Sequence, residues 1–138
     1  MKKGKVEVDT PGPLVTNVTD QVTGWVRSEG LEGDGLLHVF LPHATAGLAL
    51  METGTGSDQD LVAAMERILP RHDRYRHSHG YEVHGRDHLL PVLVSPSLIL
   101  PVHDGALVIG TYQHVVIVDP NRDNNRRTLI LSFLQDDG

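Results

Sequence analysis

The fold class of this chain depends on one stretch, Ser97-Leu98-Ile99-Leu100-Pro101-Val102-His103-Asp104-Gly105-Ala106. Two apolar runs meet there at Asp104-Gly105, and Asp-Gly between such runs is a strong signal for a β-hairpin. The second run is expected to extend from Ala106 to Asp119, and residues 128–134 read as a closing strand. The C-terminal part of the chain is therefore predicted to form an antiparallel meander.

Upstream of this stretch the apolar periodicity predicts more strands than helices. Strands are expected at residues 5–10, 14–18, 35–42 and 46–51. A helix is expected at residues 20–29, and a second one should begin with Ser57 as its N-cap and end at Pro70. The predicted fold class is α+β: an antiparallel sheet or sandwich with two or three short helices, in a single domain that spans residues 1–138.

Composition excludes several classes of function. A formal net charge of −6 argues against a general nucleic-acid surface, because such a surface needs a basic face. No apolar run approaches the roughly 20 residues that a membrane-spanning helix requires. With no cysteine, thiolate zinc sites and cysteine nucleophiles are excluded as well. The N-terminal residues contain no signal-peptide core, so a cytoplasmic location is expected.

One polar stretch, HSHGYEVHGRDH from His77 to His88, holds four of the nine histidines. His77 and His79 would share a face in an extended segment, and His84 and His88 would share one in a helix. Neutral imidazole is the common nitrogen ligand of zinc, and three histidines can leave one coordination position open. The residues alone leave three interpretations open: a metal site, an acid–base centre or a solvated polar loop.

Other candidate residues lie at strand ends. His43 shares a face with the apolar residues of the preceding strand, which suits either a core histidine or one that faces a cleft. Glu52 ends an apolar run, where partial desolvation would raise its pKa and suit it to act as a general base. Arg122, Arg126 and Arg127 crowd Asp119, either as a surface ion pair or as a phosphate clamp.

Short motifs spread along the chain occur together in a known order. They are Val18-Thr19-Asp20, Gly35-Leu36-Leu37-His38-Val39-Phe40, Pro42-His43-Ala44-Thr45-Ala46, Glu52, Tyr75-Arg76-His77, Asp87-His88-Leu89, Gly110-Thr111-Tyr112-Gln113 and Arg126-Arg127. With these motifs, from about Val15 to Leu134, the chain resembles the YjbQ-like family, small proteins known as secondary thiamine-phosphate synthase enzymes. The resemblance implies an α+β fold assembled as a homotrimer, with clefts where subunits meet.

The resemblance also implies roles for particular residues. It points to His43, His77 and His88 as ligands of a divalent metal ion, zinc or magnesium. It implies catalytic roles for His43, Glu52 and His88, and it implies substrate contacts from four further residues, Thr45, Gln113, Arg126 and Arg127. The chain departs from the family pattern at Tyr112, Asp119 and Asp87, which stand where the family usually has tryptophan, glutamate and a small residue.

The activity that the resemblance implies joins an aminopyrimidine diphosphate to a thiazole phosphate, with loss of pyrophosphate. A small phosphorylated substrate is therefore the expected partner, rather than nucleic acid or a membrane. Two alternatives use the same residues: a metal-dependent hydrolase, and a non-enzymatic trimeric protein that binds a ligand or a metal. In each case His77 and His88 are expected to converge with His43, whereas His79 and His84 are expected to be solvated or to contact substrate.

Overall fold

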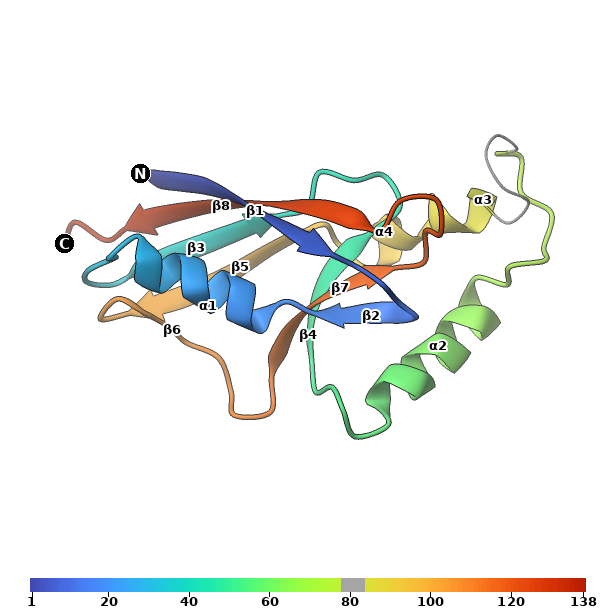
Figure 1. The fold of residues 1–138 in the computed structure, drawn as a ribbon, viewed down its shortest axis with the longest axis horizontal. Coiled ribbons are helices and arrows are strands. Elements are labelled where there is room, and N and C mark those ends of the chain that lie inside the picture. Colours follow the sequence, from blue (N-terminus) through green and yellow to red (C-terminus); the bar gives the residue numbers. More distant parts are fainter. Residues whose placement is uncertain (78–83) are drawn as a thin grey trace.

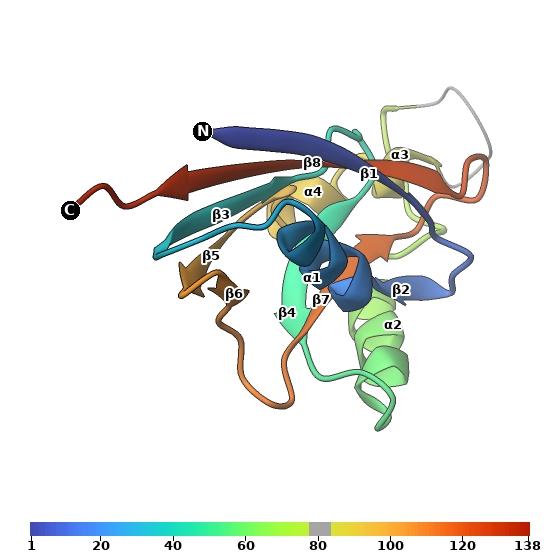
Figure 2. The same ribbon diagram turned by 60° about the vertical axis from the view of Figure 1, so that its left-hand side comes forward.

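The computed structural model describes residues 1–77 and 84–138, which form two antiparallel sheets and four helices (Figures 1 and 2). The strands are β1 (Lys2–Asp9), β2 (Leu14–Asn17), β3 (Gly35–Phe40), β4 (Gly47–Met51), β5 (Ser97–His103), β6 (Ala106–Leu107), β7 (His114–Asp119) and β8 (Arg126–Gln135). The helices are α1 (Thr19–Ser28), α2 (Ser57–Ile68), α3 (His84–Asp87) and α4 (Leu90–Leu93). The predicted α+β class is confirmed.

The larger sheet has the strand order β1-β8-β3-β5-β6, and the smaller sheet has the order β2-β7-β4. Strand β8 pairs with both β1 and β3, so it lies inside the larger sheet. Its alternation fits that place, because Leu129, Leu131 and Phe133 are buried on the inner face while the residues between them face outward.

The hairpin predicted at Asp104-Gly105 is confirmed, whereas the meander is wrong. Asp104 and Gly105 both adopt positive φ, 50° and 74°, as a tight β-turn of the hairpin type requires. Beyond β6 the chain leaves the sheet, and the side-chain oxygen of Gln113 accepts the backbone N–H of Gly110 at 2.7 Å. That local turn splits the expected long strand, and β7 joins the smaller sheet instead.

A first core lies between the larger sheet, helix α1 and one face of the smaller sheet. Val22, Trp25 and Val26 form the buried face of α1, as their spacing predicts. The Trp25 ring lies so close to β1 that a Cβ at Gly4 would overlap it. Helix α1 is thereby held against the inner face of the larger sheet.

A second core covers the opposite face of the smaller sheet, where Val116 and Val118 contact residues of α2 and α4. Helix α2 ends before Pro70, as predicted, but its N-cap is Gly56 rather than Ser57. Gly56 has a φ of 100°, a left-handed conformation that suits glycine, and Ser57 is the first helical residue.

The two sheets bring distant segments together at one end of the molecule. There α3 lies near the β7–β8 turn, and Arg86 of α3 lines one cavity with residues of that turn and of the segment after β1 (Figure 1). Among residues 1–77 and 84–138, no helix is long and apolar enough to cross a membrane. The cytoplasmic location expected from the sequence stays a prediction.

Candidate metal centre

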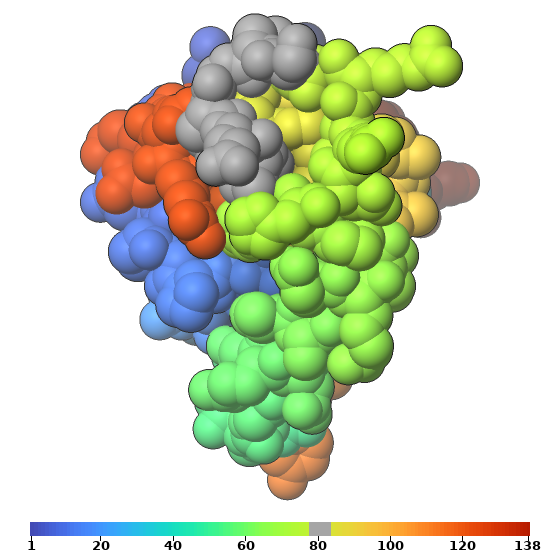
Figure 3. All heavy atoms as spheres, turned by 90° about the vertical axis from the view of Figure 1, so that its right-hand side faces the viewer, coloured from blue at the N-terminus to red at the C-terminus, as the bar shows by residue number. Residues whose placement is uncertain are grey.

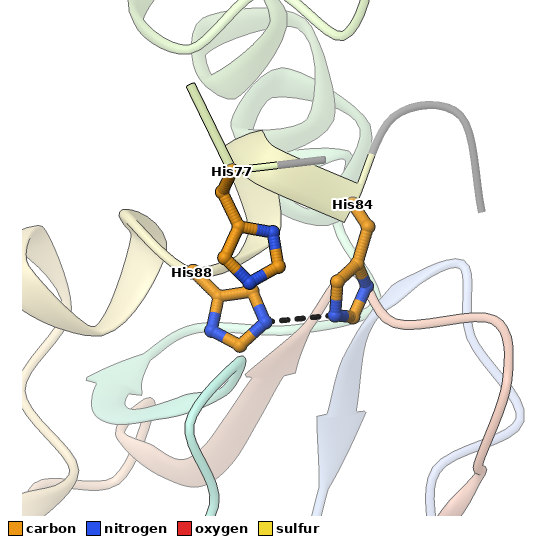
Figure 4. A group of neighbouring side chains, drawn as sticks. All are labelled: His77, His84 and His88. Carbon is orange, nitrogen blue, oxygen red and sulfur yellow. Dashed lines mark hydrogen bonds between the residues drawn. The ribbon is translucent and has the colours of Figure 1, made fainter. Parts of the chain in front are cut away.

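Three histidines meet beside helix α3: His77, His84 and His88 (Figure 4). Each offers one ring nitrogen, and these three atoms lie within 4.8 Å of one another. The Nε2 atoms of His84 and His88 are 2.7 Å apart, and the rings of His77 and His88 have centroids 4.1 Å apart. A tetrahedral zinc ion with Zn–N bonds of about 2.0–2.1 Å holds its nitrogen ligands roughly 3.3 Å apart, so small side-chain shifts would suffice.

The local sequence explains this arrangement. His84 and His88 are four residues apart across α3 and the turn after it, so both rings lie on one face. His77 approaches from the segment that follows α2, and Gly85 makes that approach possible. A Cβ at Gly85 would lie 2.9 Å from the carbonyl oxygen of His77, closer than a real Cβ comes to another atom. The group therefore needs a glycine at position 85.

Of the two alternatives expected for His84, solvation is wrong, because His84 is only 7% exposed and belongs to the three-histidine group. Contact with a substrate stays a prediction. The polar sequence around His84 suggests an exposed loop, whereas in α3 this histidine is buried with its neighbours Gly85, Arg86 and Asp87. His79, the other histidine expected to be solvated, lies outside the described residues.

His43 does not lie in this group, contrary to the expected convergence. Strand β3 ends opposite Ile130, and beyond that point His43 Nε2 accepts the backbone N–H of Thr128 at 2.9 Å. Burial, followed by the charge of Arg127, holds the pKa of His43 below its ordinary value. His43 therefore accepts a backbone hydrogen bond from β8. His84, rather than His43, lies beside His77 and His88.

Thr45 and Arg127 belong to a buried network around Asp119. Arg127 Nε and Nη2 donate to the two carboxylate oxygens of Asp119, at 2.6 and 3.1 Å. Thr10 also donates to Asp119, and Thr45 accepts from Arg127 at 3.4 Å. The alternative of a surface ion pair is wrong for Arg127, because its side chain is 4% exposed and that of Asp119 is 1% exposed.

The remaining predicted site residues are exposed and lie apart from the histidines. Arg126 donates to Asp9 on β1, and Gln113 is used in the turn with Gly110. Glu52 follows the last residue of β4 and is exposed, so the desolvation expected for it is absent. The structure gives none of the three a contact with the three-histidine group.

Sequence reasoning missed two buried charges on α3. Arg86 is 2% exposed and Asp87 is 0% exposed. The Nε and Nη1 atoms of Arg86 and both carboxylate oxygens of Asp87 have no hydrogen-bond partner among the described residues. Burial raises the pKa of Asp87 to about 6 against the opposing charge of Arg71. A Gly-Arg-Asp segment in a polar stretch suggests solvent exposure. In the sequence, the one sign that this segment is buried is Asp87 itself, which stands where the family usually has a small residue.

A cavity of 490 Å³ lies next to these residues. It is lined by Arg86, by residues of α2 and the segment after it, by the β7–β8 turn and by the segment between β1 and β2. Figure 3 shows this side of the molecule, where green, orange-red and blue segments meet. Segments far apart in the sequence thus enclose one polar hollow.

The fold and the site together define a small α+β protein with two antiparallel sheets and a three-histidine group at one end. The family model described as "UPF0047 protein YjbQ-like" matches residues 4–136, and the chain belongs to this family. The resemblance read from the sequence is thereby confirmed.

Relatives cover most of the chain. The UPF0047 protein Rv2556c of Mycobacterium tuberculosis is 50% identical over 130 residues, which is 94% of this chain and 96% of that protein. The UPF0047 protein YjbQ of Escherichia coli O157:H7 is 30% identical over 84% of this chain and 85% of its own length. Among solved structures, the hypothetical protein APE1520 of Aeropyrum pernix has a TM-score of 0.88 and 28% identity, and the match covers 99% of this chain and 100% of that one.

Proposed function

We propose that His77, His84 and His88 bind a divalent metal ion and that this centre acts on a small phosphorylated substrate. The observation that carries the proposal is the convergence of three imidazole nitrogens within 4.8 Å. The donor set fits zinc better than magnesium, because magnesium prefers oxygen ligands. Three protein ligands also leave a fourth position of a tetrahedral site for water or substrate.

A bound zinc ion would supply a Lewis acid and lower the pKa of a coordinated water to about 7. The chain's own residues orient and desolvate the site. His84 is buried on α3, and Gly85 admits His77 and Tyr75 at close range. Tyr75 in turn donates to the carbonyl of Pro70 at 2.6 Å, which ties the His77 segment to the end of α2.

For the substrate, the proposal follows the family resemblance: an aminopyrimidine diphosphate joined to a thiazole phosphate, with release of pyrophosphate. The purified protein, supplied with both precursors and zinc, should form thiamine phosphate. His88→Ala should abolish product, whereas His72→Ala, a change at an exposed histidine outside the group, should not. Equal product from the wild type and His88→Ala would refute the catalytic assignment.

The same site would serve a metal-dependent hydrolase, and one comparison separates the two reactions. A hydrolase releases phosphate from a single precursor, whereas the transferase needs both precursors together. Phosphate release from one precursor that is lost in His88→Ala would identify the hydrolase. Precursor binding without turnover in the zinc-loaded protein would identify a binding protein.

Metal binding is tested separately from activity. Untagged protein is analysed for bound metal, and the metal-free protein is titrated with zinc by calorimetry. The wild type should bind one zinc ion per chain. Ala substitutions at His77, His84 and His88 should each weaken binding, and His72→Ala should not. Zinc binding that survives all three substitutions would overturn the proposal.

We also propose that the chain assembles as a homotrimer. The supporting feature is an apolar patch on the outer face of the larger sheet, formed by Leu36, Ile99 and Leu134, which are 47–61% exposed. Leu36 pairs in register with Leu134, and Ile99 pairs with His38, two residues along β3 from Leu36. Light scattering after size exclusion should give three chains per particle. Ile99→Glu should shift that mass toward the monomer, whereas Ile68→Glu on α2 should leave it unchanged. A monomeric wild type would refute this assembly.

A further inference from the structure

Arg86 on α3 is a buried charged residue without a full set of hydrogen-bond partners in the described chain. It is 2% exposed, and its buried Nε and Nη1 atoms have no hydrogen-bond partner among residues 1–77 and 84–138. Buried charges are normally paired, because removing them from water is costly. A buried guanidinium with unpaired nitrogens therefore suggests that a bound ligand accepts its hydrogen bonds.

The side chain of Arg86 lines the 490 Å³ cavity described above. Two further arginines, Arg71 and Arg122, line the same cavity, and the Nη1 atom of Arg71 is also buried with no hydrogen-bond partner in the described residues. The hollow thus presents guanidinium N–H groups from three separate segments of the chain. Guanidinium N–H groups match the oxygen atoms of phosphate in both charge and geometry.

The acidic residues of the cavity do not cancel this charge. Asp119 is already neutralised by the bidentate pair with Arg127. Glu66 accepts the backbone N–H of Arg71 at 3.2 Å and stands 4.0 Å from its Nε. Asp87, the other buried charge on α3, is not among the lining residues. Positive charge therefore exceeds negative charge in this hollow.

Arg86 lies two residues from both His84 and His88, so on one helical turn its side chain points away from their shared face. Among residues 1–77 and 84–138, no histidine lines the cavity. We propose that the cavity is a phosphate-binding site, in which Arg86 and Arg71 bind the oxygens of a phosphate group and Arg122 covers it from the exposed side. The site does not depend on the metal centre. Of the three arginines that the sequence offers as one possible phosphate clamp, Arg122, Arg126 and Arg127, it includes Arg122.

Hydrogen-bonding groups around the arginines suit the same ligand. The side-chain amides of Asn121 and Asn125, from the β7–β8 turn, also line the hollow. Thr10 lines it too, but its hydroxyl already donates to Asp119. Asn121 Nδ2 donates to Thr45, which anchors the turn to the buried network of Asp119. This hydrogen bond fixes the position of the β7–β8 turn, which carries Arg122, beside the cavity.

The test uses the full metal-free chain with inorganic phosphate and pyrophosphate as probes, at constant ionic strength adjusted with sodium chloride. Calorimetry should detect binding to the wild type, and Arg86→Gln should weaken it at least tenfold. Arg122→Gln should weaken binding less, because its side chain is exposed. Arg74→Gln, a change at an exposed arginine that does not line the cavity, is the matched control and should bind as the wild type does.

Two further measurements separate this site from a structural role and from the metal proposal. Without phosphate, Arg86→Gln should melt at the same or a higher temperature than the wild type, because it removes an unpaired buried charge, and phosphate should no longer raise that temperature. His88→Ala should retain phosphate binding. The proposal is overturned if the wild type binds neither probe, if Arg86→Gln and Arg122→Gln both bind as tightly as the wild type, or if Arg86→Gln melts lower while it still binds phosphate.

Discussion

Two buried arginines in this protein have opposite surroundings. Arg127 on β8 binds both oxygens of Asp119, and Thr10 and the backbone N–H of Asn121 complete that carboxylate. Arg86 on α3 is buried as deeply, yet two of its nitrogens have no partner in the described chain. The buried ion pair of Arg127 and Asp119 has its hydrogen bonds within the protein, whereas Arg86 has nitrogens available for the proposed ligand of the cavity.

The largest effect on stability is expected from a substitution at Arg127. Arg127→Gln leaves the carboxylate of Asp119 buried without its cation, so we expect a loss of about 3–5 kcal/mol in the free energy of unfolding. Arg86→Gln should cost none. Urea denaturation of both variants measures the difference, and the double variant Arg127→Met/Asp119→Leu should recover part of the loss. Equal effects from the two single variants would contradict the contrast drawn between these arginines.

The second test compares two histidines, one inside and one outside the three-histidine group. In the proposed metal site, His84→Ala removes one of three ligands. The zinc affinity should therefore fall by more than it does on loss of an outer-shell partner, which costs about 10–100-fold. His43→Ala should leave the zinc affinity unchanged and lower stability instead, because the N–H of Thr128 loses its acceptor. Calorimetric titration measures the affinity, and a large effect of His43→Ala on it would restore the metal site expected from the sequence.

A third test addresses the close approach that lets the histidines meet. Gly85→Ala places a methyl group 2.5 Å from Cβ of Tyr75, so we expect an overpacking cost of about 1–3 kcal/mol and a weaker zinc affinity. Gly24→Ala is the control, because that helical glycine has no atom within 4 Å of the added Cβ and the change should stabilise α1 by about 0.5–1 kcal/mol. Thermal unfolding follows both, and an unperturbed Gly85→Ala would refute the packing argument.

The smallest expected effect concerns pH. The folded-state pKa of His43 lies below its ordinary value of 6.5, so the unfolded chain binds a proton more readily. The stability contribution of neutral His43 is therefore complete above about pH 6.5 and is lost as the pH falls through the lower, folded-state pKa. His43→Gln should show a shallower loss of stability between about pH 7 and pH 5. His72→Gln should keep the wild-type profile in urea titrations, and identical profiles for His43→Gln and the wild type would contradict this assignment.

Local patterns predicted the separate elements well. The Asp104-Gly105 hairpin, the buried face of α1 and the closing strand at residues 128–134 each depend on neighbours in the sequence, and all are present in the structure. The prediction of one long strand from Ala106 to Asp119 is wrong, for a reason that apolar periodicity does not reveal. The backbone N–H of Gly110 donates to the side-chain oxygen of Gln113, which closes a turn inside this run, and β7 pairs with strands far upstream.

The sequence by itself determined the α+β class, the family and the presence of a histidine-rich stretch, because composition, periodicity and motif order are all present in the linear sequence. Only the tertiary structure decided that His84 rather than His43 joins His77 and His88, and that Arg86 is buried beside a cavity. Both outcomes depend on how α3 packs against the sheets and the β7–β8 turn. The burial of Arg86 and the convergence of the histidines depend on contacts between distant segments, and the spacing of residues along the chain does not predict such contacts.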